Sequence, residues 1–116
     1  MPNAEDTSAP WPEAWITLSA LAAQVPRLSM GTLVAGNTYR HPAVLAKMAA
    51  TLDHISGGRA ILGLGAGWQE NEHQQYGIPF YTVKERLARL EEACHVIKAL
   101  FPASLRPDQE LSLIHI

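Results

Sequence analysis

"GRAILGLGAGW", residues 58–68, is the stretch that decides the fold of this chain. It is a short apolar run followed by glycines at alternate positions 63, 65 and 67. The dinucleotide-binding fingerprint does not fit, because Trp68 stands where its third glycine belongs, and no Gly-Lys-Ser/Thr sequence follows as in a Walker loop. Two interpretations remain. The glycines either admit a neighbouring backbone at the end of a strand, or they form a turn that approaches a ligand.

The composition indicates one small globular domain. The chain has 116 residues, of which 47% are hydrophobic and 17% charged, and its formal net charge is -2. Without a basic stripe we expect no nucleic-acid partner. No apolar run reaches the roughly 18 residues of a membrane helix, and residues 1–10 lack a signal-peptide pattern. The single cysteine, Cys94, excludes an internal disulfide and favours a reducing compartment, so we expect a cytoplasmic protein without a membrane partner.

Apolar residues at three- and four-residue steps predict helices over 12–25, 42–56 and 82–101. Pro12 is predicted to be the first helical residue of the first helix, and Pro102 to follow the end of the last. The third helix starts with a capping box formed by Thr82 and Glu85. The apolar faces are Trp15, Leu18, Ala22 and Val25; Leu45, Met48, Leu52 and Ile55; and Leu87, Leu90, Cys94, Ile97 and Phe101.

Two strands are predicted between these helices, Leu28–Val34 and Arg59–Gly65, with loops at 35–40 and 69–81. The second strand is apolar at consecutive positions, which is typical of a parallel strand buried on both faces. The alternation of helix and strand gives a βαβ unit with flanking helices, so the fold class is α/β. Two strands cannot make a doubly covered parallel sheet, because both would be edges. We therefore expect a piece of a larger domain.

The last residues, "LSLIHI" (111–116), follow no period of the preceding chain. They resemble the in-frame translation of an adapter used in sequencing libraries, so we interpret them as non-native and leave them out of the predicted fold. The alternative is a short third strand.

The segments "YRHPAVLAK", "LDHISGGR" and "GLGAGW", in this order, resemble the bacterial luciferase-like monooxygenase family, and its branch of F420-dependent oxidoreductases in particular. The resemblance covers residues 11–101. It implies a fragment of a (β/α)8 TIM barrel containing its third and fourth strands. Residues 1–10 would be a loop or disordered end, 11–101 a partial barrel domain, and 102–116 a tail.

The resemblance implies an enzyme that transfers a hydride between coenzyme F420 and a small organic substrate. An FMN-dependent monooxygenase of the same family is the first alternative, and an inactive truncated fragment without binding activity is the second. We expect this fragment alone to be inactive, and the complete protein to be a homodimer. No catalytic residue can be assigned, because the acid or base of other members belongs to segments that this chain lacks.

Cofactor-binding residues also follow from the resemblance. They are Leu33, Val34, Gly36, Ala66, Gly67 and Asn71. Family members carry a non-proline cis peptide that forms a bulge behind the cofactor ring, and it maps to the Leu33–Val34 bond. Trp68 stands where the glucose-6-phosphate dehydrogenase branch has a general-acid glutamate. The resemblance therefore assigns neither that catalytic acid nor that sugar substrate to this chain. Trp68 either walls the substrate pocket or packs over the barrel rim.

Other polar residues have structural interpretations. Glu70, Glu72 and His73 could suggest a metal, but they lack a His-Glu-x-x-His pattern, so we expect a solvated polar loop and no metal. Asp53 is predicted to pair with Arg59 rather than to act in catalysis.

Overall fold

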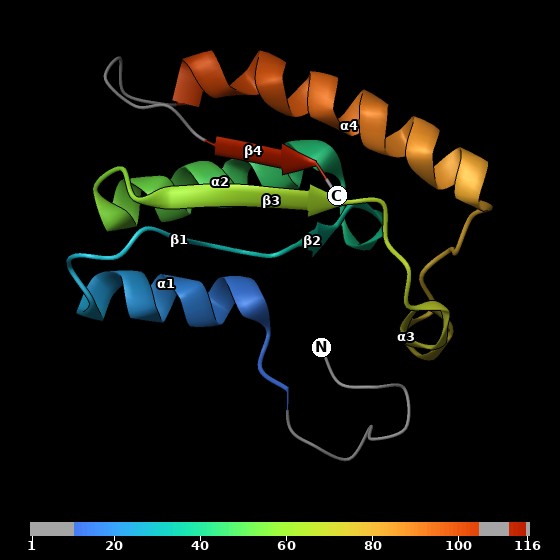
Figure 1. Ribbon diagram of the computed structural model, residues 1–116, viewed down its shortest axis with the longest axis horizontal. Coiled ribbons are helices and arrows are strands. Elements are labelled where there is room, and N and C mark those ends of the chain that lie inside the picture. The colour runs from blue at the N-terminus through green and yellow to red at the C-terminus, as the bar shows by residue number, and fades with distance from the viewer. Residues whose placement is uncertain (1–10, 105–111, 116) are drawn as a thin grey trace.

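The computed structural model describes residues 11–104 and 112–115 and shows short parallel strands flanked by helices (Figure 1). The elements in chain order are α1 (Ala14–Gln24), β1 (Met30–Gly31), β2 (Ala35–Gly36), the 3-10 helix η1 (Asn37–Tyr39), α2 (Pro42–Ser56), β3 (Ala60–Gly65), α3 (Glu70–Tyr76), α4 (Val83–Ser104) and β4 (Ser112–His115). The α/β class is confirmed.

Strand β3 is the centre of the sheet, and every pairing in the sheet is parallel. Both β1 and β2 pair with β3, and β4 pairs with it too. Because Leu64 pairs with both Ala35 and His115, β4 lies on the opposite edge of β3 from β2. The predicted parallel pairing of the two strands is confirmed. Ser112–His115 form the third strand that the sequence left as an alternative, while residues 111 and 116 lie outside the described part of the chain.

The predicted strand Leu28–Val34 is wrong in its extent, because a bulge divides it. Between the pairs Gly31–Ile61 and Ala35–Leu64, the first strand advances four residues and β3 three. The extra residue leaves 32–34 outside the ladder and separates β1 from β2. The peptide bond between Leu33 and Val34 is cis, which confirms the expected position.

The helix boundaries differ from the predicted ones at two prolines. Helix α1 begins at Ala14, and Pro12 precedes its N-cap, because the Glu13 carboxylate accepts the Ile16 N–H at 2.7 Å and fixes the start there. Helix α4 continues through Pro102 to Ser104, so the predicted end before this proline is three residues short. Helix α2 begins at Pro42, as predicted.

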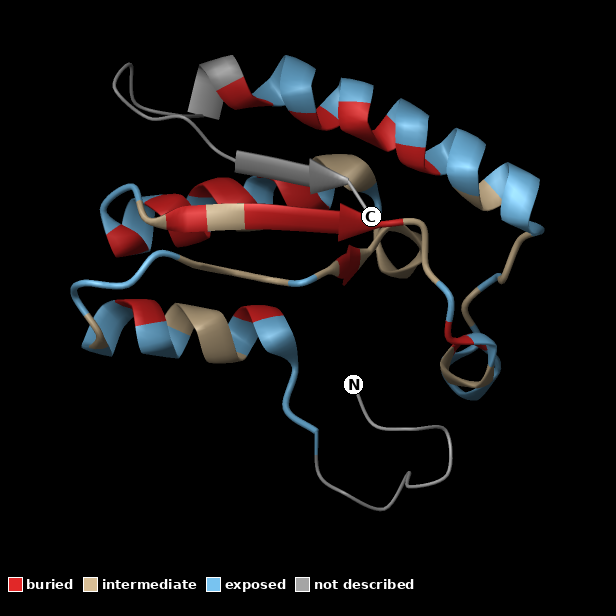
Figure 2. Ribbon diagram, in the orientation of Figure 1, coloured by how far each residue is buried: buried red, intermediate tan, exposed pale blue. Residues whose placement is uncertain are grey.

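The three long helices cover one face of β3. Alternate residues of the strand, Ala60, Leu62 and Leu64, belong to a hydrophobic core that also includes side chains of α1, α2 and α4. Helix α2 packs against both α1 and α4 as well as β3. Figure 2 shows β3 and the inward side of α2 as mostly buried. A parallel sheet with helices on its outer face is the arrangement of a TIM-barrel wall.

Most of the predicted apolar faces enter this core, including Cys94, whose thiol pKa is raised by burial. Val25, Ile55 and Leu87 are exceptions: Val25 is half-buried, and Ile55 and Leu87 are exposed by 44% and 55%. Ile55 lies in the last turn of α2, where Leu52 and Ser56 take the buried face. Leu87 lies in the first turns of α4, which extend past the end of the sheet (Figure 2).

The predicted ion pair between Asp53 and Arg59 is wrong, and the described residues show none between them. The Arg59 guanidinium instead donates to four backbone carbonyls at 2.7–2.9 Å, those of Ala22, Val25, Leu28 and Ser56. It thereby ties the end of α1 and the following linker to the end of α2. One carboxylate oxygen of Asp53 accepts from the Ala60 N–H at 3.3 Å.

Within residues 11–104 and 112–115, no helix has both the length and the apolarity that crossing a membrane requires.

Candidate functional site

The carboxyl ends of β2 and β3 lie side by side. Gly36, the last residue of β2, pairs with Gly65, the last residue of β3. The segments that follow, 37–40 and 66–69, therefore leave the sheet next to each other. Loops at the carboxyl ends of parallel strands form the active sites of TIM barrels. This end of the sheet is the candidate site.

The residues that the resemblance implies for cofactor binding all belong to the bulge, to β2 or to the segment after β3. Leu33, at the bulge, is 80% exposed, and Trp68 is 61% exposed. Asn71 lies in the first turn of α3, and its side-chain oxygen accepts the Glu72 N–H at 3.0 Å. Their contacts with a cofactor stay a prediction.

The predicted solvated loop 69–81 is wrong, because residues Glu70–Tyr76 form helix α3. His73, on this helix, is 1% exposed. The sequence gives no sign that one face of this helix is buried, because Glu70–Tyr76 contains no apolar stripe. His73 is therefore a buried polar side chain that requires hydrogen-bond partners.

Both ring nitrogens of His73 have a partner. Nδ1 lies 2.6 Å from the Gln69 carbonyl oxygen, and Nε2 lies 2.6 Å from the Thr38 hydroxyl. A carbonyl can only accept, so Nδ1 carries the proton and donates. In the neutral ring Nε2 is then the acceptor, and the Thr38 hydroxyl donates to it. The bond to Thr38 joins α3 to η1, thirty-five residues earlier in the chain.

Two aromatic rings lie close to the His73 imidazole. The ring centroids of Tyr39 and Phe80 lie 4.9 Å and 4.7 Å from that of His73. The Tyr39 hydroxyl donates to the Glu72 carboxylate. Burial, followed by this hydrogen bond and the carboxylate charge, raises the pKa of Tyr39 above its ordinary value. Tyr39 is therefore a neutral donor at physiological pH.

Arg86, near the start of α4, contacts the glycine turn directly. Its guanidinium donates to the Gly67 carbonyl, and its Nε donates to the Tyr81 carbonyl at 3.0 Å. The guanidinium carbon lies 4.2 Å from the centre of the Phe80 ring. The turn after β3 is thus held by a side chain from the following long helix.

The glycines of the deciding stretch have separate explanations. At Gly63 an added Cβ would come within 3.0 Å of the Thr32 carbonyl oxygen, so this glycine admits the neighbouring backbone. Gly67 has φ +90°, and an added Cβ would lie 2.7 Å from the Thr38 hydroxyl oxygen. The first interpretation therefore holds for Gly63, while Gly67 is a turn closely covered by Thr38.

Two buried oxygens at this end of the sheet have no hydrogen-bond partner among the described residues. They are Oδ1 of Asn37, which follows β2, and Oε1 of Gln69, which precedes α3. A buried unpaired acceptor is unfavourable, so such atoms commonly belong to sites that a ligand or water completes. Both residues lie in the two segments of the candidate site.

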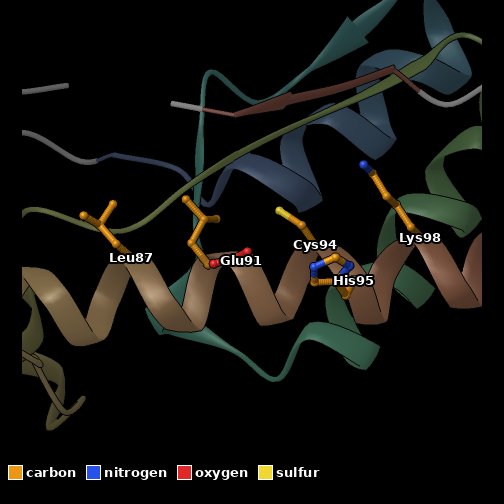
Figure 3. Close-up of a pocket in the computed structure, with 6 residues that line it drawn as sticks. Leu87, Glu91, Cys94, His95 and Lys98 are labelled. Carbon is orange, nitrogen blue, oxygen red and sulfur yellow. The ribbon is translucent and has the colours of Figure 1, made fainter.

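The described residues contain no group of three or more His, Cys, Asp or Glu side chains that could hold a metal ion. A cavity of about 380 Å³ lies elsewhere, along α4 (Figure 3). Its lining residues are Leu87, Leu90, Glu91, Cys94, His95 and Lys98. All of them belong to one helix, so the cavity is separate from the candidate site.

Sequence reasoning missed Thr38 and Arg86, and it assigned His73 to a solvated loop. No spacing in the sequence could reveal their roles, because their partners are 19 to 35 residues away. The pairing of β2 with β3 brings these segments together, and it depends on the folded register.

Comparison with known proteins places the fold in context. The family model described as luciferase-like monooxygenase matches residues 3–109. The F420-dependent glucose-6-phosphate dehydrogenase of Amycolatopsis mediterranei (strain U-32) is 41% identical over 98 residues, which are 84% of this chain and 29% of the relative. The protein of the same name from Kineococcus radiotolerans is 44% identical over 91 residues, 78% of this chain and 27% of the relative. This chain spans less than a third of either relative.

Two solved structures are similar. Monooxygenase RslO1 from Streptomyces bottropensis is 30% identical, with a TM-score of 0.65, and the match covers 74% of this chain and 25% of RslO1. An F420-dependent secondary alcohol dehydrogenase, solved in complex with an F420–acetone adduct, is 23% identical, with a TM-score of 0.80. The match covers 94% of this chain and 38% of the dehydrogenase chain. At that identity the second match supports the fold alone. The predicted class, a fragment of a TIM barrel, is confirmed.

Proposed function

This chain belongs to the luciferase-like monooxygenase family, and we propose that a complete protein containing it is an oxidoreductase that transfers a hydride between coenzyme F420 and a small organic molecule. The observation that carries the proposal is the identity of more than 40% with two F420-dependent dehydrogenases over most of this chain. When bound, the deazaflavin ring would supply the hydride chemistry, and the protein would bind and orient it.

The residues at the carboxyl ends of β2 and β3 fit a flat ring with polar edges. Leu33 offers an exposed apolar side chain, and the unpaired oxygens of Asn37 and Gln69 offer acceptors for N–H groups. The residues proposed to hold the cofactor are Leu33, Val34, Gly36, Ala66, Gly67 and Asn71. Trp68 is proposed to wall the substrate pocket, because it lies beside them and is largely exposed.

The substrate is proposed only as a small organic molecule. The glucose 6-phosphate of the named relatives is not extended to this chain, since Trp68 replaces the general-acid glutamate that the resemblance implies for that branch. A flavin-dependent monooxygenase is the second candidate, supported by the 30% identity with monooxygenase RslO1. We also propose that the complete protein is cytoplasmic and forms a homodimer. Light scattering of the complete protein would test the oligomeric state.

The test is a fluorescence titration of the complete protein with F420 and with FMN. We expect the parent to bind F420 more tightly than FMN. Asn71→Ala should weaken F420 binding by about fivefold, the equivalent of one hydrogen bond of about 1 kcal/mol. Gln75→Ala, at an exposed position on the same helix, is the matched control and should bind like the parent.

Preference for FMN would favour the second candidate, and binding of neither cofactor would refute the proposal. The 116-residue chain, titrated in parallel, is expected to bind neither cofactor.

A further inference from the structure

We propose that His73 is a positioning residue, which locks η1 and the segment 66–76 into one rigid unit and thereby fixes the Gly67 turn toward the cofactor. The inference rests on the proposed function for the identity of the ligand. Its structural part, the locking of the two segments, concerns only residues of this chain.

The first step is the bond between Thr38 and His73. Because the Gln69 carbonyl holds the proton on Nδ1, Nε2 of the neutral ring is an acceptor, and the Thr38 hydroxyl donates its hydrogen to it. That fixes the rotation of the Thr38 side chain. Its hydroxyl oxygen and methyl carbon lie 2.7 Å and 3.3 Å from the point where a Cβ of Gly67 would stand. The side chain that His73 orients is therefore the one that covers the Gly67 turn.

The second step is the rigidity of His73 itself. It is buried to 99%, and the rings of Tyr39 and Phe80 lie close to its imidazole. The hydrogen bond from Tyr39 to Glu72 adds a second link between the same two segments. A side chain with both nitrogens bonded and two ring neighbours has little rotational freedom. It can therefore transmit a fixed position from α3 to Thr38.

The third step is the contact of Arg86 with the Gly67 turn. Arg86 donates to the Gly67 carbonyl, so this peptide is held by a cation from α4 while Thr38 covers its Cα. None of Thr38, His73 or Arg86 belongs to the hydrophobic core between β3 and the long helices. These polar links join the loops to one another, so we expect their loss to change the position of the loops more than the helix–sheet core.

The test uses three single variants of the complete protein, the double variant His73→Phe/Thr38→Val and one control. His73→Phe keeps an aromatic ring beside Tyr39 and Phe80 but removes the acceptor for Thr38. Thr38→Val removes the donor at nearly constant shape, and Thr38→Ser keeps the hydroxyl. His95→Phe, an identical substitution at an exposed position of α4, is the matched control.

The first readout is amide hydrogen exchange without cofactor. We expect His73→Phe and Thr38→Val to exchange about 5- to 100-fold faster over residues 66–71, the factor that corresponds to losing one or two buried hydrogen bonds. Exchange in β3 and α2 should stay at the parental rate. Faster exchange throughout the core would mean a general loss of stability and would overturn the positioning role, as would parental exchange over 66–71.

The second readout is the dissociation constant for F420 and for FMN. We expect the same two variants to bind the preferred cofactor at least fivefold more weakly, Thr38→Ser to restore binding, and His95→Phe to bind like the parent. The double variant His73→Phe/Thr38→Val should bind no more weakly than His73→Phe alone, because His73→Phe already removes the bond that Thr38→Val breaks. Parental affinity in His73→Phe would overturn the inference. A parent protein that binds neither cofactor would refute the proposed function, while the exchange rates would still decide whether His73 locks the loops.

Discussion

Gly63→Ala in the complete protein tests how the deciding glycine stretch shapes the sheet. The added Cβ would lie within 3.0 Å of the Thr32 carbonyl oxygen and 3.2 Å from its carbon, whereas ordinary contact begins near 3.4 Å. The carbonyl belongs to the backbone of the bulge, so it cannot rotate away. Its displacement should also disturb the bond from the Thr32 hydroxyl to the Gly63 carbonyl, which measures 3.0 Å.

We expect Gly63→Ala to lower the free energy of unfolding by about 2–4 kcal/mol. Overpacking contributes about 1–3 kcal/mol, and the hydrogen bond contributes about 1 kcal/mol. Gly57→Ala is the matched control. It has φ +67° and no atom within 4 Å of an added Cβ, so only backbone strain of about 1–2 kcal/mol applies. Urea unfolding at an unchanged m-value measures both. If Gly63→Ala destabilises no more than Gly57→Ala, close backbone approach does not explain the glycine.

Three further predictions concern stability. Arg59→Met should lower the free energy of unfolding by about 3 kcal/mol, because three of the four hydrogen bonds from Arg59 to backbone carbonyls are partly buried. Arg27→Met, at an exposed position, should change it little. Equal effects of the two substitutions in urea unfolding would argue against a stabilising role of the Arg59 bonds. Hydrogen bonds from Thr82 hold the pKa of Glu85 below its ordinary value. At pH values above the ordinary glutamate pKa, the capping box should therefore stabilise α4 fully, and this stabilisation should be lost as the pH falls through the lowered pKa of Glu85. Thr82→Ala should raise that pKa in an NMR titration, and an unchanged value would contradict the assignment. The 116-residue chain alone should aggregate or melt without cooperativity, because the outer edge of β1 and β2 is unpaired in the described part of the chain; a monomer with a sharp thermal transition would contradict this.

The sequence was sufficient for the elements whose signal is local. The apolar run before Gly65 predicted the central parallel strand, and proline and apolar period predicted α2 from its first residue. The extent of the first strand was mispredicted, because a bulge depends on register with β3 and not on the residues of 28–34 themselves. Helix α3 was missed since it has no apolar stripe, and its stability comes from contacts of His73 with segments on either side.

The candidate site was predictable only to the level of segments. The resemblance led to the bulge and to the turn after β3; the bulge lies beside Gly63 of β3, and the turn begins after Gly65, where that strand ends. It could not lead to Thr38, His73 or Arg86, because hydrogen bonds between distant segments leave no periodic trace in the chain. Arg59 shows the same limit, since a nearby carboxylate in the sequence suggested an ion pair, whereas folding surrounds the guanidinium with carbonyls.

These polar links also decide how contact between Gly67 and the cofactor can be tested. Gly67→Val is the simplest substitution, but a side chain there would meet Thr38 at 2.7 Å and would sit on a backbone with φ +90°. Weaker cofactor binding could then result from a clash with the ring or from displacement of Thr38, and the measurement would not separate them. Asn71→Ala adds no atom beside the Gly67 turn, although it removes the acceptor of the Glu72 N–H, and Thr38→Ser keeps the donor to His73. If Asn71→Ala weakens binding while Thr38→Ser does not, the result supports direct contact between the ligand and the segment after β3. Thr38→Val then tests separately whether the bond to His73 supports that contact.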